Sequence, residues 1–264
     1  MIVLHSNSTD VYKNLAAEDM LLDRDGAPEP VLFIYRNAPA VVIGKNQNPW
    51  RECAVSRLET LGIKLARRIS GGGTVYHDAG NLNVSCVLPR AAYERRDMLN
   101  LFIAALGGLG IQAEIVNSTS LTVGGLKISG NAFCYRRDQV LHHGTFLMRA
   151  DLEALHQALR PDIMEMETRA VASVRMPVMN LGELVREDEF IRELTRNVAA
   201  RFGTAREAGE DLLDATALEA RAEKMRGWEW LFGATPDFMV RRDGRDITVH
   251  RGRVHGGDRF EGFA

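Results

Sequence analysis

The most informative segment of the chain is Arg67-Arg68-Ile69-Ser70-Gly71-Gly72-Gly73-Thr74-Val75-Tyr76-His77-Asp78-Ala79-Gly80-Asn81. Two arginines end an apolar segment, three glycines follow, and a short β-prone run comes next. Successive glycines let the backbone adopt positive φ and bring bare N–H groups close to a ligand. The two arginines before the turn indicate that this ligand is an anion. An arginine-flanked surface turn is the alternative that this stretch alone leaves open.

The glycine turn matches neither of the common nucleotide motifs. A Walker loop needs glycine and lysine followed by Ser or Thr at a fixed spacing, which this chain lacks. A dinucleotide fingerprint needs a glycine where Tyr76 stands. What remains is a loop that can wrap a small anion, with Thr74 to Tyr76 as a strand edge beside it.

The composition is that of an ordinary globular protein. The chain has 264 residues, of which 45% are apolar and 26% charged, and a formal charge of −2. This length suits one large domain with a small appendage, and the charge gives no sign of a nucleic-acid-binding surface. Because no run of 18 apolar residues and no basic signal region occur, we expect no membrane contact and a cytoplasmic location.

The chain has three cysteines, Cys53, Cys86 and Cys134, which are widely spaced in the sequence. An odd number without a CxxC pair predicts neither a disulfide framework nor a zinc site. We therefore expect a reducing compartment and no metal held by cysteine.

Strand patterns cluster early in the chain and helix patterns cluster late. Residues 31–35 and 40–43 are apolar runs typical of buried strands, and residues 82–88 alternate as in a half-buried strand. A helix capped by Ser8 or Asp10 is expected to run to about Leu22 and to end at Gly26 and Pro28. Because strands and helices do not alternate regularly, the pattern predicts an α+β fold.

A second candidate segment runs from Gly124 to Asn131, where a two-glycine hairpin turn is followed by Lys127. Strand alternation puts Lys127 and Ser129 on one face and Leu126 and Ile128 on the other. A solvated strand lysine is one interpretation. The other is a point charge for a carboxylate and a phosphate together, which is favoured because lysine occurs only five times in the chain.

A third candidate segment is His142-His143-Gly144-Thr145. Adjacent strand residues point to opposite faces, so the two histidines do not readily ligate one metal. We expect one histidine in the core and one exposed. No metal site is predicted, because no carboxylate or cysteine cluster stands at ligand spacing.

Taken together, these segments resemble the lipoate–protein ligase A family, from the first strand to about residue 240. The resemblance implies a mixed β-sheet domain packed with helices, related to the catalytic domain of biotin–protein ligases. The biotin-ligase arginine-glycine loop is not present, so lipoate or octanoate is the better substrate class. The residues that carry the resemblance are Asn46-Gln47-Asn48-Pro49-Trp50, the stretch 67–78, Gly80-Asn81, Lys127-Ile128-Ser129-Gly130, His142-His143-Gly144-Thr145 and Trp228-Glu229-Trp230.

The resemblance also implies a reaction with ATP. In the family, ATP activates the lipoate carboxylate to lipoyl-adenylate, and Mg²⁺ would screen the leaving pyrophosphate. The acyl group then passes to a lysine of a lipoyl-acceptor domain, either a 2-oxoacid dehydrogenase E2 or the glycine-cleavage H protein. We therefore expect ATP and Mg²⁺ as cofactors, lipoate as substrate, and such acceptor domains as partners.

By this resemblance, Lys127 is the catalytic residue that contacts both lipoate and ATP, and Arg68 lies at the nucleotide. The apolar acyl chain needs a dry slot, for which Val42, Val75 and Leu82 are the expected walls together with Lys127 at its end. His77 and His143 are the candidates for a general base. The full set expected to bind ATP or lipoyl-adenylate is Arg68, Gly71, Gly72, Gly73, Thr74, Val75, Tyr76, His77, Asn81, Lys127, His143 and Gly144.

Two features depart from the family pattern. Many members carry Asn-Asp on the strand before the lysine hairpin, where this chain has Thr119-Ser120. Members usually also carry a C-terminal accessory domain, whereas here a catalytic domain of residues 1–240 would be followed only by a hairpin and tail, 241–264. We expect this chain either to use a separate small accessory-domain protein or to work as a one-domain enzyme.

Two other functions stay open. One is a lipoyl or octanoyl transferase of the same fold that uses a preformed acyl donor. Octanoyltransferases of this superfamily use a nucleophilic cysteine, but Cys134 follows the lysine hairpin rather than standing at the expected place, and Cys86 is expected in the core. The other is a non-catalytic module that binds lipoate or an acceptor domain.

Overall fold

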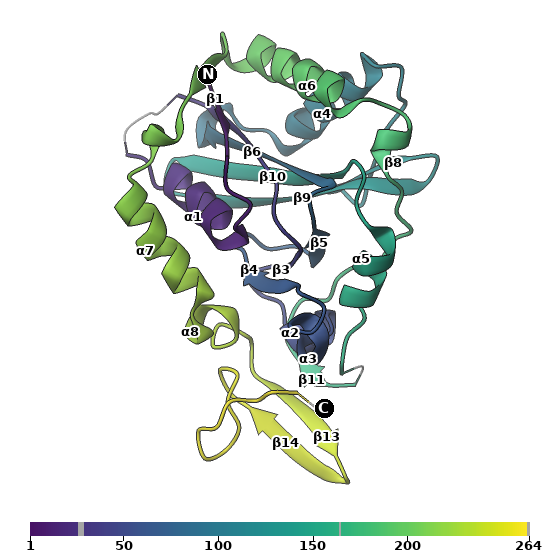
Figure 1. Ribbon diagram of the computed structural model, residues 1–264, viewed down its shortest axis with the longest axis vertical. Helices are drawn as coiled ribbons and strands as arrows, with labels where there is room; N and C mark the ends of the chain where they lie inside the picture. Colours follow the sequence, from purple (N-terminus) through teal and green to yellow (C-terminus); the bar gives the residue numbers. More distant parts are fainter. Residues whose placement is uncertain (26–28, 164, 263–264) are drawn as a thin grey trace.

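A mixed eight-stranded sheet forms the centre of the computed structural model, which describes residues 1–25, 29–163 and 165–262. β1 runs parallel to both of its neighbours, and the other neighbouring pairs are antiparallel. The predicted α+β class is therefore confirmed (Figure 1). The strand order is β12 (Arg206–Ala208), β1 (Ile2–His5), β2 (Val31–Tyr35), β6 (Asn81–Pro89), β10 (Gln139–Leu147), β9 (Leu126–Arg136), β8 (Ser120–Val123) and β7 (Glu114–Val116).

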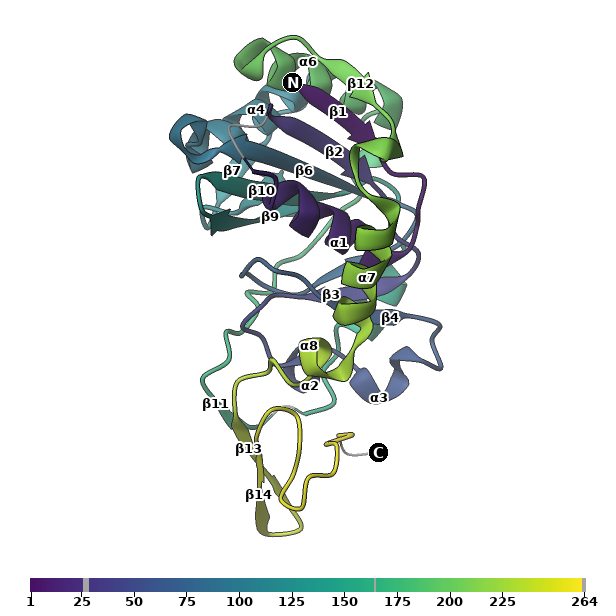
Figure 2. The same ribbon diagram turned by 90° about the vertical axis from the view of Figure 1, so that its left-hand side faces the viewer.

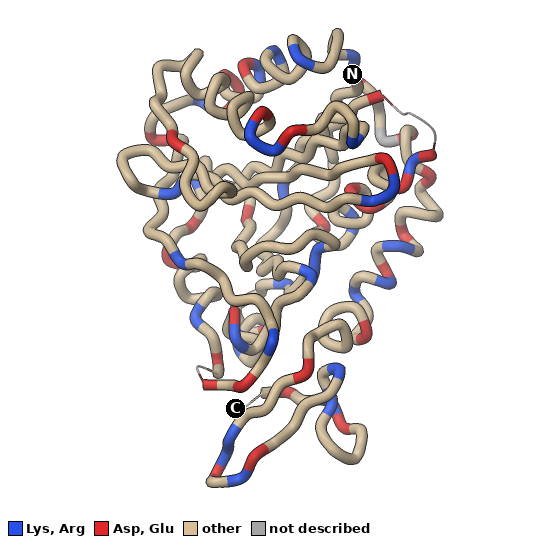
Figure 3. Tube along the Cα trace, turned by 180° about the vertical axis from the view of Figure 1, so that it is seen from behind, with Lys and Arg blue, Asp and Glu red and all other residues tan. Residues whose placement is uncertain are grey.

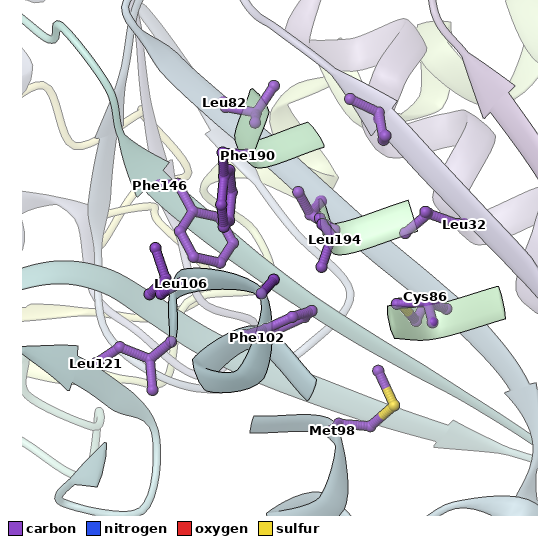
Figure 4. Close-up of a cluster of buried hydrophobic side chains, with 14 of the residues drawn as sticks. Leu32, Leu82, Cys86, Met98, Phe102, Leu106, Leu121, Phe146, Phe190 and Leu194 are labelled. Carbon is purple, nitrogen blue, oxygen red and sulfur yellow. The ribbon is translucent and has the colours of Figure 1, made fainter. Parts of the chain in front are cut away.

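One face of this sheet is covered by α4 (Arg95–Gly107) and α6 (Glu187–Phe202). Phe102, Phe146 and Phe190, from α4, β10 and α6, meet at the centre of the cluster (Figure 4). The ring centroids of Phe102 and Phe146 lie 5.5 Å apart, and those of Phe146 and Phe190 lie 4.7 Å apart. Truncating one of these rings to alanine would cost about 3–5 kcal/mol.

The opposite face is covered by α1 (Val11–Leu22), against which α7 (Ala215–Arg226) packs. Asp10 caps α1 by accepting hydrogen bonds from the N–H groups of Tyr12 and Lys13, which confirms one of the two predicted caps. The predicted helix end at Gly26 and Pro28 lies outside the described residues.

A small sheet lies below the large one, in the order β4 (Lys64–Arg67), β3 (Ala40–Ile43) and β5 (Val75–His77). Figure 2 shows it on the α1 side of the large sheet, away from α4 and α6. Because β5 is an edge strand, its outer backbone groups are not used for pairing within this sheet. Three short helices lie around it: α2 (Pro49–Glu52), α3 (Val55–Leu58) and α5 (Leu152–Ala158).

A third sheet, at the bottom of Figure 1, joins β11 (Glu167–Thr168) to the hairpin of β13 (Phe238–Arg242) and β14 (Arg245–Val249). Trp50, which is fully buried, packs on Phe238 and Phe260 of this part. The domain division at residue 240 stays a prediction, and that residue lies within β13. Short 3₁₀ helices occur at Arg90–Ala92, Leu181–Glu183 and Glu210–Leu212.

Arg67 fastens the C-terminal region to the small sheet. Its side chain is fully buried and donates to the carbonyls of Lys45 (2.9 Å) and Gln47 (2.8 Å). It also donates to the carbonyl of Leu231 at 2.6 Å, where α8 (Trp228–Leu231) ends, and to the Thr235 hydroxyl at 2.8 Å. The expectation that both arginines of the opening stretch face an anion is therefore wrong for Arg67, because its donors are used within the protein.

Charges of both signs are interspersed along the helices and the C-terminal hairpin (Figure 3). This mixture agrees with the formal charge of −2. Among the described residues, no helix has the length and apolar character that crossing a membrane requires.

Candidate functional site

Two adjoining cavities, of about 210 Å³ (cavity A) and about 410 Å³ (cavity B), are lined from both the large and the small sheet. Their walls have several residues in common, among them Val75, Lys127 and Thr145. Cavity B has a buried end, formed by Leu15, Tyr35, Val42, His77 and Asn83, which are each at most 4% exposed. Its rim is formed by exposed residues, among them Gly72 and Val174.

The glycine loop, residues 70–74, is held in shape by Arg68. Its Nη2 donates to the carbonyls of Gly71 (2.6 Å) and Gly73 (2.7 Å), and its Nη1 donates to the carbonyl of Val42 (3.1 Å). Burial lowers the pKa of Arg68 to about 10, so the guanidinium stays charged at neutral pH. Arg68 lines cavity B, and its hydrogen bonds go to the loop and to the Val42 carbonyl of β3.

Lys127 lies in β9 at the junction of the two cavities. Ser129 also lines cavity A, which confirms that alternation puts these two side chains on one face. Burial and the nearby charge of Arg68 lower the pKa of Lys127, and no carboxylate among the described residues offsets this effect. An ammonium in this setting is stabilised by an anion that binds beside it.

A segment without helix or strand, residues 169–177, crosses both cavities, and we call it the strap. It follows β11 and ends beside β9, where the Lys127 N–H donates to the Pro177 carbonyl at 2.9 Å. Midway, the Ser173 hydroxyl donates to Glu52 and accepts from the N–H of Thr74 (2.8 Å) and the side chain of Gln47 (3.0 Å). The strap was not predicted from the sequence, because it carries neither a periodic pattern nor a motif.

A polar cluster lies behind the wall of cavity B. Glu18, fully buried, accepts hydrogen bonds from the Tyr35 hydroxyl (2.9 Å), from Ser85 and from His143 Nδ1 (2.9 Å). Burial raises the pKa of Glu18, but His143 and the hydroxyl donors outweigh burial and lower it. Glu18 was not predicted as a site residue, although its spacing from Leu15 and Leu22 puts it on the buried stripe of α1.

Each candidate general base has at least one ring nitrogen that contacts a neighbouring side chain. His143 Nδ1 contacts Glu18, and its Nε2 lies 2.7 Å from the Ser70 hydroxyl. The pKa of His77 is lowered to about 3 by burial and by the charge of Arg68, and its Nδ1 lies 2.8 Å from Asn37 Nδ2. Both histidines are therefore engaged within the protein, and the arrangement does not favour a base role for either.

His142 and His143 do point to opposite faces of β10, as predicted. His142 contacts the Tyr93 hydroxyl through Nδ1 at 2.9 Å, on the side of α4. The expectation that one of the two is exposed is wrong, since His142 is 1% and His143 8% exposed. The large sheet is covered on both faces here, so both positions are interior.

Comparison with known proteins identifies the family to which this chain belongs. Residues 10–203 match the lipoyl protein ligase A/B catalytic domain. The chain belongs to this family. A crystal structure of lipoate-protein ligase A bound with ATP is 26% identical, covers 87% of this chain and 96% of its own, and has a TM-score of 0.71.

Structures from Thermoplasma acidophilum also resemble this member of the lipoyl protein ligase A/B family. A protein solved with bound lipoic acid is 25% identical over 87% of this chain and 98% of its own, with a TM-score of 0.72. A bi-partite lipoate protein ligase is 24% identical over 92% of this chain and 97% of its own, with a TM-score of 0.73, which shows a shared fold.

Some of the remaining predicted site residues line the cavities, and others are buried away from them. Val42 lines cavity B, and Val75 lines both cavities. Leu82 lines neither, because alternation along β6 turns it into the cluster under α4 and α6. Asn81 is fully buried at the start of β6, lines neither cavity and contacts Asn83 at 3.1 Å. The following expected residues do line a cavity: Gly71, Gly72, Gly73, Thr74, Tyr76, His77, His143 and Gly144.

The thiols are poorly placed for a covalent mechanism. Burial raises the pKa of Cys53, Cys86 and Cys134, so each is protonated at neutral pH. None of the three lines either cavity. In this member of the family, the cysteine mechanism therefore has no support from the described residues.

Metal ligands are scarce at the cavities. The described residues contain no group of three or more His, Cys, Asp or Glu that could hold a metal ion. The carboxylate that lines cavity A is Glu52, which already accepts hydrogen bonds from Ser173, and Ser120 lines cavity B where many members have Asp. These residues do not form a dedicated Mg²⁺ site.

Proposed function

We propose that this chain is an ATP-dependent lipoate–protein ligase. In the first step, a lipoate carboxylate oxygen attacks the α-phosphorus of ATP, and the bond to pyrophosphate breaks. In the second step, a neutral lysine amine of the acceptor attacks the acyl carbon, AMP leaves, and the amine loses a proton. The observation that carries the proposal is the position of Lys127 where the two cavities meet, with no carboxylate in the described part of the chain to offset its charge.

The positive charge of Lys127 is the physical reason why this position suits adenylation. A carboxylate and an α-phosphate repel each other, and a fixed cation between them lowers the barrier to their approach. Lys127 supplies such a cation from a strand, and its backbone is held by the strap. Because burial and Arg68 disfavour the bare ammonium, two anions beside it gain more from the charge than they would in water.

We assign the acyl chain to cavity B and the adenosine to cavity A. Cavity B combines an apolar buried end, with Leu15 and Val42, and a rim that reaches Lys127. Cavity A is lined by Tyr76, Leu147 and Leu155, which offer apolar surfaces to a flat base. The free edge of β5 offers backbone groups to the edge of that base.

The acceptor stays a proposal drawn from the family. The lipoyl protein ligase A/B family transfers acyl groups to lipoyl domains, and we propose such a domain, of an E2 or an H protein, as partner. A ligase of this kind would act in the cytoplasm. Mg²⁺ would arrive on the phosphates of ATP, because the residues that the structure describes offer no group of three or more His, Cys, Asp or Glu to hold it.

The test is lipoate-dependent exchange of labelled pyrophosphate into ATP, followed by transfer to an acceptor domain. Exchange together with transfer supports the ligase. Transfer from synthetic lipoyl-adenylate without any exchange contradicts it. Lipoate binding without either reaction would leave only a binding module.

A transferase that takes a preformed acyl donor is the second candidate, and one observation favours it. Thr119 and Ser120 line cavity B where many family members have Asn-Asp, so the site lacks a carboxylate there. The variant Ser120→Asp separates the two functions. A large gain in exchange activity with unchanged transfer from lipoyl-adenylate would support the transferase.

A further inference from the structure

Gly130 lies within β9 at a place where the backbone does not require a glycine. Its φ is outside the left-handed region, and it pairs with Thr145 of β10 and with Ser120 of β8. Glycine weakens the interior of a strand, because it loses the most conformational freedom on folding. A glycine at such a position often marks the close approach of another group. The identity of that group therefore indicates what Gly130 does.

The group that approaches Gly130 is the end of the Lys127 side chain. A Cβ atom added at Gly130 would lie 3.0 Å from Lys127 Nζ and 3.1 Å from Lys127 Cε. The next nearest atom, Thr145 Oγ1, would be 3.9 Å away, which is an ordinary contact. By contrast, a Cβ atom at Gly80 would lie 2.0 Å from the Arg149 carbonyl oxygen, which is backbone. The fold therefore needs the glycine at position 80, whereas at position 130 one flexible side chain needs it.

The Lys127 backbone is held in place on the side of the strap. Its N–H donates to the Pro177 carbonyl at 2.9 Å, and its carbonyl accepts from the Met179 N–H at 3.0 Å. Lys127 also pairs with Thr122 of β8, beside an irregularity in the register of the two strands. A group that crowds the ammonium would therefore act on the side-chain torsions of Lys127 and would move its Nζ atom.

The displaced ammonium would enter the space that the proposed function gives to the ligands. Gly130, Lys127 and Thr145 all belong to the wall that is common to cavity A and cavity B. A Cβ atom at Gly130 would project from the sheet at this junction, so it would push the ammonium off the sheet and into the cavities. Without that atom, the ammonium lies against the backbone of β9.

We propose that Gly130 is a positioning residue, which keeps the Lys127 ammonium against β9 so that the lipoate carboxylate and the α-phosphate can meet beside it. The proposal rests on the proposed function. A fixed cation lowers the barrier only where charge develops in the transition state. A displacement of about 1 Å can cost about 100-fold in rate. The position of the ammonium therefore matters as much as its charge.

The test is a double-mutant cycle of Gly130→Ala and Lys127→Ala, measured by lipoate-dependent pyrophosphate exchange. Gly107→Ala is the matched control, because a Cβ atom there, at the end of α4, would face open space among the described residues. Urea unfolding checks that each variant is folded. We expect Gly130→Ala to fold, because alanine suits a strand better than glycine and the crowded atoms end a flexible side chain.

We expect Gly130→Ala to lower kcat for exchange about tenfold or more and to change the KM for lipoate and for ATP less than about threefold, since the lost interaction belongs to the transition state. In the Lys127→Ala background, the same substitution should change the exchange rate less than about twofold, because the crowded atoms are already gone. An unchanged kcat overturns the proposal. An equal loss in both backgrounds also overturns it, because the methyl group then acts directly on the ligand or the fold.

A structural measurement distinguishes failure of this proposal from failure of the proposed function. If wild-type protein shows no exchange, the proposed function has failed, and crystal structures of wild-type and Gly130→Ala protein then decide about Gly130. We expect Lys127 Nζ to move by at least about 0.5 Å, to an ordinary contact distance from the new methyl group, while the β9 backbone keeps its place. An ammonium at the same position in both structures overturns the proposal.

Discussion

Arg67 and Arg68 are adjacent and buried, but they bind different parts of the molecule. Arg68 holds the glycine loop, whereas Arg67 holds backbone carbonyls at the ends of two distant segments. We predict that Arg67→Met lowers the free energy of unfolding by at least about 3 kcal/mol, because several buried carbonyls lose their donor. Urea unfolding measures this, with exposed Arg57→Met as the control. Equal stability of the two variants would contradict the assignment.

The lowered pKa of Lys127 leads us to expect that adenylation activity depends on pH. Its lowered pKa means that the ammonium loses its proton at a lower pH than an ordinary lysine, which has a pKa of 10.5. Any step that needs the charge is therefore retained at lower pH and lost as pH rises through this lowered value. We expect kcat/KM for adenylation to fall on the alkaline side at a pH below 10.5. A profile that stays flat to that pH would contradict this.

For single residues, the amino-acid pattern predicts the chemical role of a side chain better than it predicts which atoms that side chain contacts. Lys127 could be predicted, because a strand lysine after a glycine turn is unusual in a chain with so few lysines. Arg67 could not be assigned, because charge alone does not distinguish a donor to backbone carbonyls from a donor to an anion. Leu82 was placed on the wrong side of its strand, since alternation gives two faces but not which face meets the cavity.

At the scale of elements, the strap is the part that depends most on single contacts. We predict that Ser173→Ala raises the KM for lipoate and for ATP about three- to tenfold, because removing the hydroxyl frees the strap from Glu52 and Thr74. Limited proteolysis should show faster cleavage within residues 169–177. Exposed Ser56→Ala is the control, and an equal effect of the two substitutions would contradict the account.

Strands and helices with a clear period were predictable, whereas the strap was not. The two-glycine turn before Lys127 has φ of +57° and +80° at Gly124 and Gly125, as a tight hairpin requires. Residues 169–177 are defined by tertiary contacts alone, so no local pattern reveals them. The site residues on strands could therefore be predicted from the sequence, whereas those on the strap could not.

For the whole molecule, two interior histidines predict a loss of stability in acid. The pKa values of His77 and His142 are lowered to about 3 by burial, against 6.5 for an ordinary histidine. As pH falls below 6.5, the unfolded chain binds protons that the folded chain does not, so the free energy of unfolding decreases. Each histidine contributes up to about 1.4 kcal/mol per pH unit.

Urea unfolding between pH 7 and pH 5 measures this slope. His142→Asn should reduce it, because this substitution removes one of the two groups, while exposed His255→Asn should leave it unchanged. An identical slope for wild-type protein and a folded His142→Asn protein would contradict the prediction. The α+β class was predictable because the sheet pattern is strong, but the depth of burial of the histidines depends on which helices cover each face.

The role of Lys127 is tested by measuring pyrophosphate exchange by Lys127→Ala beside the matched control Lys45→Ala, whose lysine is exposed. We predict that Lys127→Ala loses at least about 100-fold in lipoate-dependent exchange, because the charge between the two anions is gone. Lys45→Ala should keep wild-type activity. Exchange by a folded Lys127→Ala protein at the wild-type rate would contradict the account.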